Sequence, residues 1–184
     1  MHKNKELAKR KQLQNLYNTI PNLLWSVLCL VPITMFCYQL MQVKSFWMFL
    51  AISILSLFLP NTFFDKIQLA NTTTIYKKLG VPIVNKFVQN GDIINRRIRK
   101  DIPGYRAIIL NKLSVKKLIK QTYIFEKFHF MLFVFYTLTT VYALLNQYLA
   151  WIFILLFSNL LYNVYPNLLQ QYIRVKLKRY ERNC

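Results

Sequence analysis

The sequence predicts an all-α integral membrane protein with four transmembrane helices, arranged as two hairpins with a basic cytoplasmic segment between them. Two observations predict this fold class. Hydrophobic residues make up 55% of the 184 residues and charged residues only 17%, against roughly 25% charged residues in soluble domains. In addition, residues 12–43, 45–64 and 128–173 contain no Asp, Glu, Lys or Arg. This pattern excludes a soluble nucleic-acid-binding protein and a disordered chain.

The lengths of the uncharged runs predict the individual spans. A helix needs about 20 apolar residues to cross the hydrocarbon core of a bilayer. The run at 128–173 is therefore long enough for two spans, with a reversal near Asn146-Gln147-Tyr148. The two earlier runs predict another hairpin, with spans at about Leu23–Leu40 and Phe46–Leu59 and a turn around Lys44.

The basic residues predict the orientation in the membrane. Of the 25 Lys and Arg residues, five precede the first span, fourteen lie between Lys66 and Lys127, and five follow Tyr172. Lys44 is the one basic residue in a turn on the opposite side. Because basic residues near span ends stay in the cytoplasm, we expect a multi-pass protein of the cytoplasmic (inner) membrane with both termini and the central segment inside.

These expectations divide the chain into five segments. They are a basic cytoplasmic N-terminus at 1–22, a first transmembrane hairpin at 23–59, a basic cytoplasmic or interfacial segment at 60–127, a second transmembrane hairpin at 128–165 and a basic cytoplasmic tail at 166–184. Within the central segment, we expect a short helix from Asn71 or Thr72 to Lys78 and an amphipathic surface helix from Pro82 to Gln89. A turn at Asn90-Gly91-Asp92 follows, and a long helical pattern extends from Ser114 to Leu145.

The densest cationic cluster is Arg96-Arg97-Ile98-Arg99-Lys100. Three ligands suit such a cluster: nucleic acid, the anionic head groups of membrane lipids, or a substrate phosphate clamped by the guanidinium groups of Arg96 and Arg97. Polybasic segments beside a bilayer ordinarily bind anionic lipid. We therefore expect a membrane-lipid partner and no nucleic acid, with the phosphate clamp as the alternative.

Glu126 and His129 form the pair with catalytic potential. Their i, i+3 spacing places them on one face of the long helix, where it enters the membrane. A carboxylate that orients an imidazole and raises its basicity makes His129 a candidate general base for acyl transfer to a hydroxyl. The alternative is a solvated pair that anchors the helix at the interface. No second Glu/His set completes a metal site and no nucleotide-binding motif occurs, so we expect no metal and no bound cofactor.

A polar seam runs along the fourth predicted span. Asn159, Asn163 and Asn167 recur at i, i+4 and i+8 and so share one helix face. Polar groups at that depth face the bundle or a cavity, where they either join the spans by hydrogen bonds or contact a substrate. Pro166 predicts a break or kink near the cytoplasmic end of this helix.

Several short motifs follow one another from residue 60 onward. They are Pro60-Asn61-Thr62-Phe63-Phe64, a Tyr- and Lys-bearing short helix that ends at Gly80-Val81, the turn at 90–92, Glu126-Lys127-Phe128-His129, and the closing set Asn163, Pro166, Gln170, Tyr172, Arg174, Lys176 and Leu177. In this order and spacing the chain resembles the glycosyl-4,4'-diaponeurosporenoate acyltransferases. These small membrane enzymes attach a fatty acyl chain to the sugar in staphyloxanthin-type carotenoid synthesis. Gln171 departs from the family pattern, which usually has Arg there.

The resemblance implies a membrane-embedded acyltransferase that esterifies a hydroxyl of a lipid-like acceptor, a glycosylated carotenoid or another glycolipid, with a fatty acyl group. Its partners are then an acyl donor and a lipid-like hydroxyl acceptor. The expected catalytic residues are Glu126 and His129, and the expected substrate contacts are Asn163, Gln170, Tyr172, Arg174, Arg96 and Arg97. The rival hypothesis is a non-catalytic membrane scaffold or accessory subunit of a lipid-processing complex. A channel or transporter is disfavoured because no acidic residue lies in any predicted span.

Overall fold

The computed structural model describes residues 2–88, 91–101 and 112–182, and nearly all of them lie in helices. The elements are α1 (His2–Leu40), α2 (Val43–Leu55) with a 3-10 extension (Ser56–Phe58), α3 (Asn61–Lys66), α4 (Thr73–Lys78), α5 (Val81–Phe87), α6 (Asp92–Asp101), α7 (Lys112–Leu145), α8 (Leu149–Asn159), a π-helical turn (Leu160–Val164) and α9 (Tyr165–Arg182). No strand occurs within the described ranges. The expected all-α class is confirmed.

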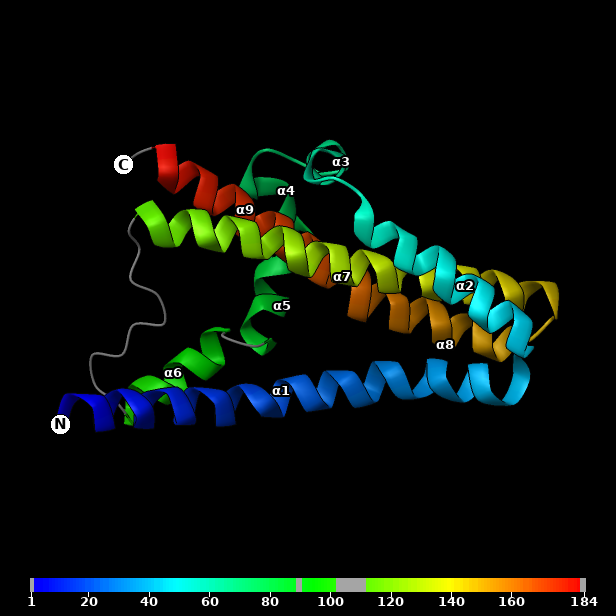
Figure 1. Cartoon of the computed structure of the whole chain (residues 1–184), viewed down its shortest axis with the longest axis horizontal. Coiled ribbons are helices and arrows are strands. Elements are labelled where there is room, and N and C mark those ends of the chain that lie inside the picture. The colour runs from blue at the N-terminus through cyan, green and yellow to red at the C-terminus, as the bar shows by residue number, and fades with distance from the viewer. Residues whose placement is uncertain (1, 89–90, 102–111, 183–184) are drawn as a thin grey trace.

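The chain reverses direction between α1 and α2 and again between α7 and α8, and both reversals lie at the same end of the molecule (Figure 1). The short helices α3 to α6 lie toward the other end, together with the start of α1 and the end of α9. Helix α7 packs against α2, α8 and α9, whereas α1 packs against α8 and α6. The polar central segment is therefore separated in space from the two apolar reversals.

Three helical stretches are long and apolar enough to cross a membrane, namely Asn15–Leu40, Leu113–Leu145 and Leu149–Arg182. The second expected span corresponds to the shorter apolar helix Val43–Phe58. At 1.5 Å per residue this helix extends about 24 Å, less than the roughly 30 Å of a hydrocarbon core. Three full-length spans are thus supported by length and composition, and α2 is a shorter fourth apolar helix.

The two reversals differ from each other in their backbone. Gln147, with φ 58°, adopts the left-handed conformation at the position expected for the second reversal. The first reversal falls at Met41-Gln42, between α1 and α2, so the expectation of a turn around Lys44 was wrong by two to three residues. Lys44 instead lies in the first turn of α2, where its long side chain can extend from the helix end to water.

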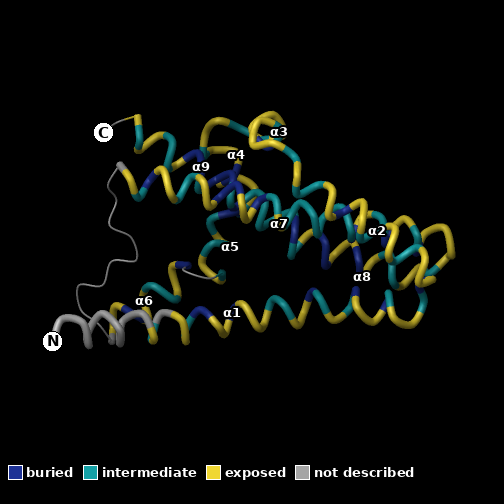
Figure 2. Tube along the Cα trace, in the orientation of Figure 1, coloured by how far each residue is buried: buried dark blue, intermediate teal, exposed yellow. Residues whose placement is uncertain are grey.

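Two buried clusters hold the helices together. One joins α1, α7 and α8 and consists of Ile33, Phe36, Tyr136, Ala143 and Leu155. The other joins α4, α5 and α9 and consists of Tyr76, Val81, Leu169, Tyr172 and Val175. Between and beyond these clusters the outer helix faces are exposed (Figure 2), and they carry many large apolar side chains. Exposed apolar surface on this scale is typical of a membrane-contacting protein.

The expected helices of the central segment are present. Thr72 lies at the N-cap position of α4, which ends at Lys78 as predicted. Gly80, with φ 74°, takes the left-handed conformation that permits the sharp turn into α5, and α5 corresponds to the helix expected from Pro82. The helix expected from Ser114 to Leu145 is α7. Of the turn expected at residues 90–92, Asn90 lies outside the described residues.

Of the break or kink expected at Pro166, the structure shows no break but a local change of helix type just before the proline. The π-helical turn at Leu160–Val164 directly precedes it, and α9 continues through the proline. A proline has no N–H to donate to the carbonyl four residues earlier, here that of Tyr162, and its ring crowds that carbonyl. One wider turn accommodates both effects, and π-turns of this kind occur frequently at functional sites.

Candidate active site

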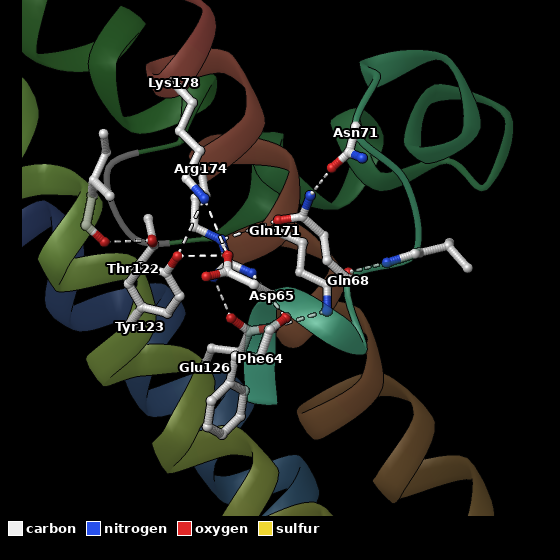
Figure 3. A network of polar contacts seen from close by, with 12 residues as sticks. Phe64, Asp65, Gln68, Asn71, Thr122, Tyr123, Glu126, Gln171, Arg174 and Lys178 are labelled. Carbon is white, nitrogen blue, oxygen red and sulfur yellow. Dashed lines mark hydrogen bonds and ion pairs between the residues drawn. The ribbon is translucent and has the colours of Figure 1, made fainter. Parts of the chain in front are cut away.

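Glu126 of α7 and Arg174 of α9 form a buried ion pair near the junction of the central segment with the long helices (Figure 3). The Arg174 side chain is fully buried and that of Glu126 is 1% exposed. Arg174 Nη1 donates to Glu126 Oε2, Nε donates to Gln68 Oε1 at 3.1 Å, and Nη2 donates to the carbonyl of Phe64 at 3.5 Å. The guanidinium carbon also lies 4.3 Å from the ring centroid of Tyr123. Every face of this buried cation is therefore occupied by protein.

Gln171 completes the coordination of Glu126. Its Nε2 donates to Glu126 Oε1 at 2.8 Å, and its Oε1 accepts from the backbone N–H of Leu69 and the hydroxyl of Tyr76, both at 3.1 Å. Burial raises the pKa of the Tyr76 phenol, so this hydroxyl stays protonated. Gln171 thus links α7, α9 and the segment before α4 through a single buried amide.

A second ion pair lies next to this network, closer to solvent. Asp65 Oδ1 accepts from Tyr123 at 2.7 Å and from Lys178 at 3.1 Å (Figure 3). Burial alone raises the pKa of the Asp65 carboxyl. The hydrogen bonds from Tyr123 and Lys178 and the charges of Lys178 and Arg174 together outweigh this effect, so the pKa of Asp65 lies below its usual value. Asp65 is therefore ionised at neutral pH and helps to balance the local cations.

The structure does not show the expected contact between Glu126 and His129. Both oxygens of Glu126 are taken by Gln171 and Arg174. The imidazole of His129 faces the π-helical turn instead, beside the backbone carbonyl of Tyr162 and the side chain of Asn163. Its ring centroid is 5.8 Å from that of Tyr162. The Tyr162 carbonyl is the one that Pro166 cannot bond, which explains why it is available to the histidine.

Three buried polar atoms near this turn lack hydrogen-bond partners in the described structure. They are His129 Nδ1, Asn163 Oδ1 and Asn167 Oδ1. Leaving a buried polar atom unpaired costs about 1–3 kcal/mol, so unpaired atoms that occur together mark a place where water or a ligand can supply the missing bonds. All three atoms can act as acceptors, given a neutral imidazole whose proton is on the other nitrogen.

The asparagine seam divides into two parts with different partners. Asn159 Nδ2 donates to Thr137 Oγ1 at 3.3 Å and to the carbonyl of Phe133 at 3.5 Å, which joins α8 to α7. Asn163 Nδ2 donates to Asn159 Oδ1 at 2.8 Å. Asn159 therefore serves the helix contact, whereas the oxygens of Asn163 and Asn167 remain open to a ligand.

The other predicted substrate contacts are dispersed. Tyr172 is buried in the cluster with Tyr76 and Leu169, and Gln170 is half-buried. Arg96 and Arg97 are exposed on α6, which packs against α1 and α5 (Figure 1). The structure does not bring these two arginines to Glu126 or His129.

Sequence reasoning missed the residues that surround the ion pair, namely Asp65, Gln68, Tyr76, Tyr123 and Gln171. One signal for them was available. The chain has only six acidic residues, and an acid in a long helix beside an apolar run needs a buried cation or donors as partners. Because the chain beyond residue 128 has its Lys and Arg only after Tyr172, the basic tail was one source of such a partner. The sequence did not identify which residue pairs with Glu126.

The fold and the site together define a helical protein with membrane-spanning capacity and a polar site where the long helices meet the basic segment. A model of the family described as glycosyl-4,4'-diaponeurosporenoate acyltransferase matches residues 60–183, which contain the whole site. The chain belongs to this family and is an acyltransferase. Searches among curated proteins and among solved structures gave no match. Family membership argues against the scaffold hypothesis.

Proposed function

We propose that this protein transfers a fatty acyl group to a sugar hydroxyl of a glycosylated carotenoid, or of a similar glycolipid, at the cytoplasmic face of the membrane. The observation that carries the proposal is the group of unpaired acceptor atoms on His129, Asn163 and Asn167. Sugar hydroxyls are donors, so a sugar offers the bonds that these atoms lack. The apolar remainder of such an acceptor would lie in the bilayer beside α7 and α8.

The depth of the site fits an acceptor with a polar head and an apolar tail. His129 lies sixteen residues before the end of α7 at Leu145, which corresponds to about 24 Å along the helix. If the reversal at Gln147 lies at the outer surface, His129 lies near the inner boundary of a core of roughly 30 Å. A sugar would reach this level from the interface while its lipid stays in the hydrocarbon.

In the proposed reaction His129 is the general base. In this proposal the other ring nitrogen keeps the proton and donates it to the Tyr162 carbonyl, which can only accept, and the unpartnered Nδ1 carries the lone pair. Nδ1 takes the proton of the acceptor hydroxyl as its oxygen attacks the acyl carbonyl carbon of a thioester donor. The C–S bond then breaks, and the thiolate leaves with the proton returned by the imidazolium. Asn163 and Asn167 hold neighbouring hydroxyls of the sugar.

Glu126 takes a positioning role in this proposal. The sequence predicted that Glu126 orients the imidazole of His129, whereas here it acts by joining two helices. With Arg174 and Gln171 it fixes α9 against α7 one helical turn from His129. The π-helical turn leads directly into α9, and His129 lies on α7, so the relative position of the turn and His129 depends on the ion pair. Rigid support of this kind keeps catalytic groups in the geometry that the reaction requires.

The membrane topology is a testable part of the proposal. We expect the reversals at Met41-Gln42 and Gln147 outside, with Lys44 beside the first of them, and residues 65–127 with both termini inside, because 24 of the 25 basic residues then stay in the cytoplasm. Single cysteines in a variant without Cys29, Cys37 and Cys184 should be labelled by an impermeant reagent near Lys44 and Gln147 only. Strong labelling from outside near Lys117 would show the opposite orientation.

The reaction itself is tested by comparing lipid and pigment extracts of cells with and without this protein. We expect one class of ester, a fatty acid on the sugar of a glycosylated lipid, to disappear when the protein is absent. Its unesterified glycoside should accumulate in the same cells. Extracts with identical esters in both cases would contradict the proposal.

A further inference from the structure

An open hollow of about 400 Å³ lies between α4 and the end of α9, away from His129 and Asn163. Its lining consists of Thr73, Lys77, Tyr172, Lys176, Arg179 and Tyr180. Three of these six side chains are cations and none is acidic. Lys176 and Arg179 are one helical turn apart on α9 and so share a face, while Lys77 comes from the opposite wall on α4.

The three cations are not neutralised by the described acidic residues. The ion pairs of the described residues involve Arg174 and Lys178, which meet Glu126 and Asp65 on the side of α9 that faces α7. Lys176 Nζ lies 5.3 Å from the ring centroid of Tyr172, another residue that lines the hollow, and this contact holds the cation against the lining. Positive charge concentrated in a concave surface attracts an anion more strongly than the same charge on a flat one.

From this hollow we infer a phosphate-binding site that holds the anionic part of the acyl donor. The inference rests on the proposed function, and it moves the anion-binding role away from the expected clamp of Arg96 and Arg97, which lie on α6 beside α1. Arg174, the other cation among the expected substrate contacts, is occupied by Glu126. Lys77, Lys176 and Arg179 take their place.

The position of the hollow also restricts the chemistry of the donor. Lys176 follows Asn163 by thirteen residues, which is about 20 Å along the helix axis. A donor bound at both places therefore has a long arm between its phosphate and its acyl carbonyl. A nucleotide-linked acyl thioester has such an arm, whereas an acyl phosphate does not. An anionic lipid head group shares the phosphate chemistry and is the other source to be distinguished.

The test measures binding without turnover. In one arm, coenzyme A is titrated into the protein in phosphatidylcholine nanodiscs, and Kd is measured by calorimetry at two salt concentrations. In the other arm, phosphatidylglycerol that stays bound to the detergent-purified protein is quantified by native mass spectrometry. The test variant is Lys176→Glu with Arg179→Glu. The matched control, Lys116→Glu with Lys117→Glu, makes the same charge change on exposed residues of α7.

We expect the test variant to bind one of these ligands about ten-fold or more weakly than wild type, whereas the control should bind both ligands about as well as wild type. Loss of coenzyme A binding supports the donor as the source of the phosphate, whereas loss of phosphatidylglycerol binding alone assigns the hollow to a lipid head group and overturns the donor role. If the reversal variant elutes as an aggregate, Lys176→Gln with Arg179→Gln replaces it. Absence of saturable binding in both arms, or an equal loss in the control, would overturn the inference.

The same assay separates this inference from the proposed function. His129 does not line the hollow. The His129→Ala protein should therefore bind coenzyme A or phosphatidylglycerol as well as wild type does, even though acyl transfer is lost. If transfer occurs but the hollow binds neither probe, the inference fails and the proposed function stands. If the hollow binds coenzyme A but no ester is formed with any glycosylated acceptor, the proposed function fails instead.

Discussion

Replacing Glu126 by Gln, or Arg174 by Gln, is expected to destabilise the protein by about 3–5 kcal/mol. Arg174→Gln leaves Glu126 as an uncompensated charge that is 1% exposed. Glu126→Gln leaves the buried Arg174 with only the longer pair to the half-exposed Asp65, at 4.0 Å. For a protein of this length, such a loss lowers the midpoint of thermal unfolding by about 6–20 °C. The measurement is thermal unfolding in detergent, followed by the fraction that elutes as a monodisperse species.

Two variants sharpen this prediction. Lys178→Gln removes an ion pair whose two side chains are each 43% exposed, and exposed pairs contribute about 1 kcal/mol or less. The double variant Glu126→Leu with Arg174→Met replaces both charges by apolar groups and should recover most of the lost stability. Single variants as stable as Lys178→Gln would show that the pair does not hold α7 against α9.

His129→Ala is expected to lower kcat by about 10²–10⁴-fold, the range that a general base contributes. The reason is that Nδ1 is buried without a hydrogen-bond partner among the described residues, so in the proposed tautomer its lone pair is available to the acceptor hydroxyl. Stability should change much less than in the Glu126 variants, because His129 carries no ion pair. The measurement is the initial rate of ester formation at saturating donor and acceptor.

The matched control for His129 is Phe125→Ala, four residues earlier on α7. Phe125 is 42% exposed, so this variant removes an aromatic side chain from the same helix, whereas Phe128 is unsuitable because its ring lies 5.3 Å from that of His129. We expect near wild-type kcat from it. A His129→Ala protein that elutes normally and turns over at the wild-type rate would remove His129 from the mechanism.

The helices were predictable from the sequence because local patterns determine them. An uninterrupted helical pattern predicted α7, and the cap at Thr72 with the break at Gly80 predicted α4. The unpredicted features depend on several effects at once. At Pro166 the absent N–H predicts a break or kink, whereas the chain takes one π-helical turn and continues as α9.

The site was only partly predictable for the same reason. The spacing of Glu126 and His129 and the family resemblance at Arg174 were sufficient to select all three as candidate site residues. The pairing was not predictable, because Glu126 and Arg174 are 48 residues apart and no local rule chooses Arg174 over a nearer cation. The i, i+3 spacing correctly placed Glu126 and His129 on one helix. In the structure Glu126 pairs with residues of α9, whereas His129 packs against the π-helical turn.

The most direct test of the account is acyl transfer by the purified protein in nanodiscs, supplied with a labelled fatty acyl thioester and a carotenoid glycoside. The same carotenoid without its sugar serves as the control acceptor. The account predicts labelled ester on a sugar hydroxyl of the glycoside, no product from the sugar-free carotenoid, and loss of the product with His129→Ala. Equal acylation of both acceptors, or undiminished transfer by His129→Ala, would contradict it.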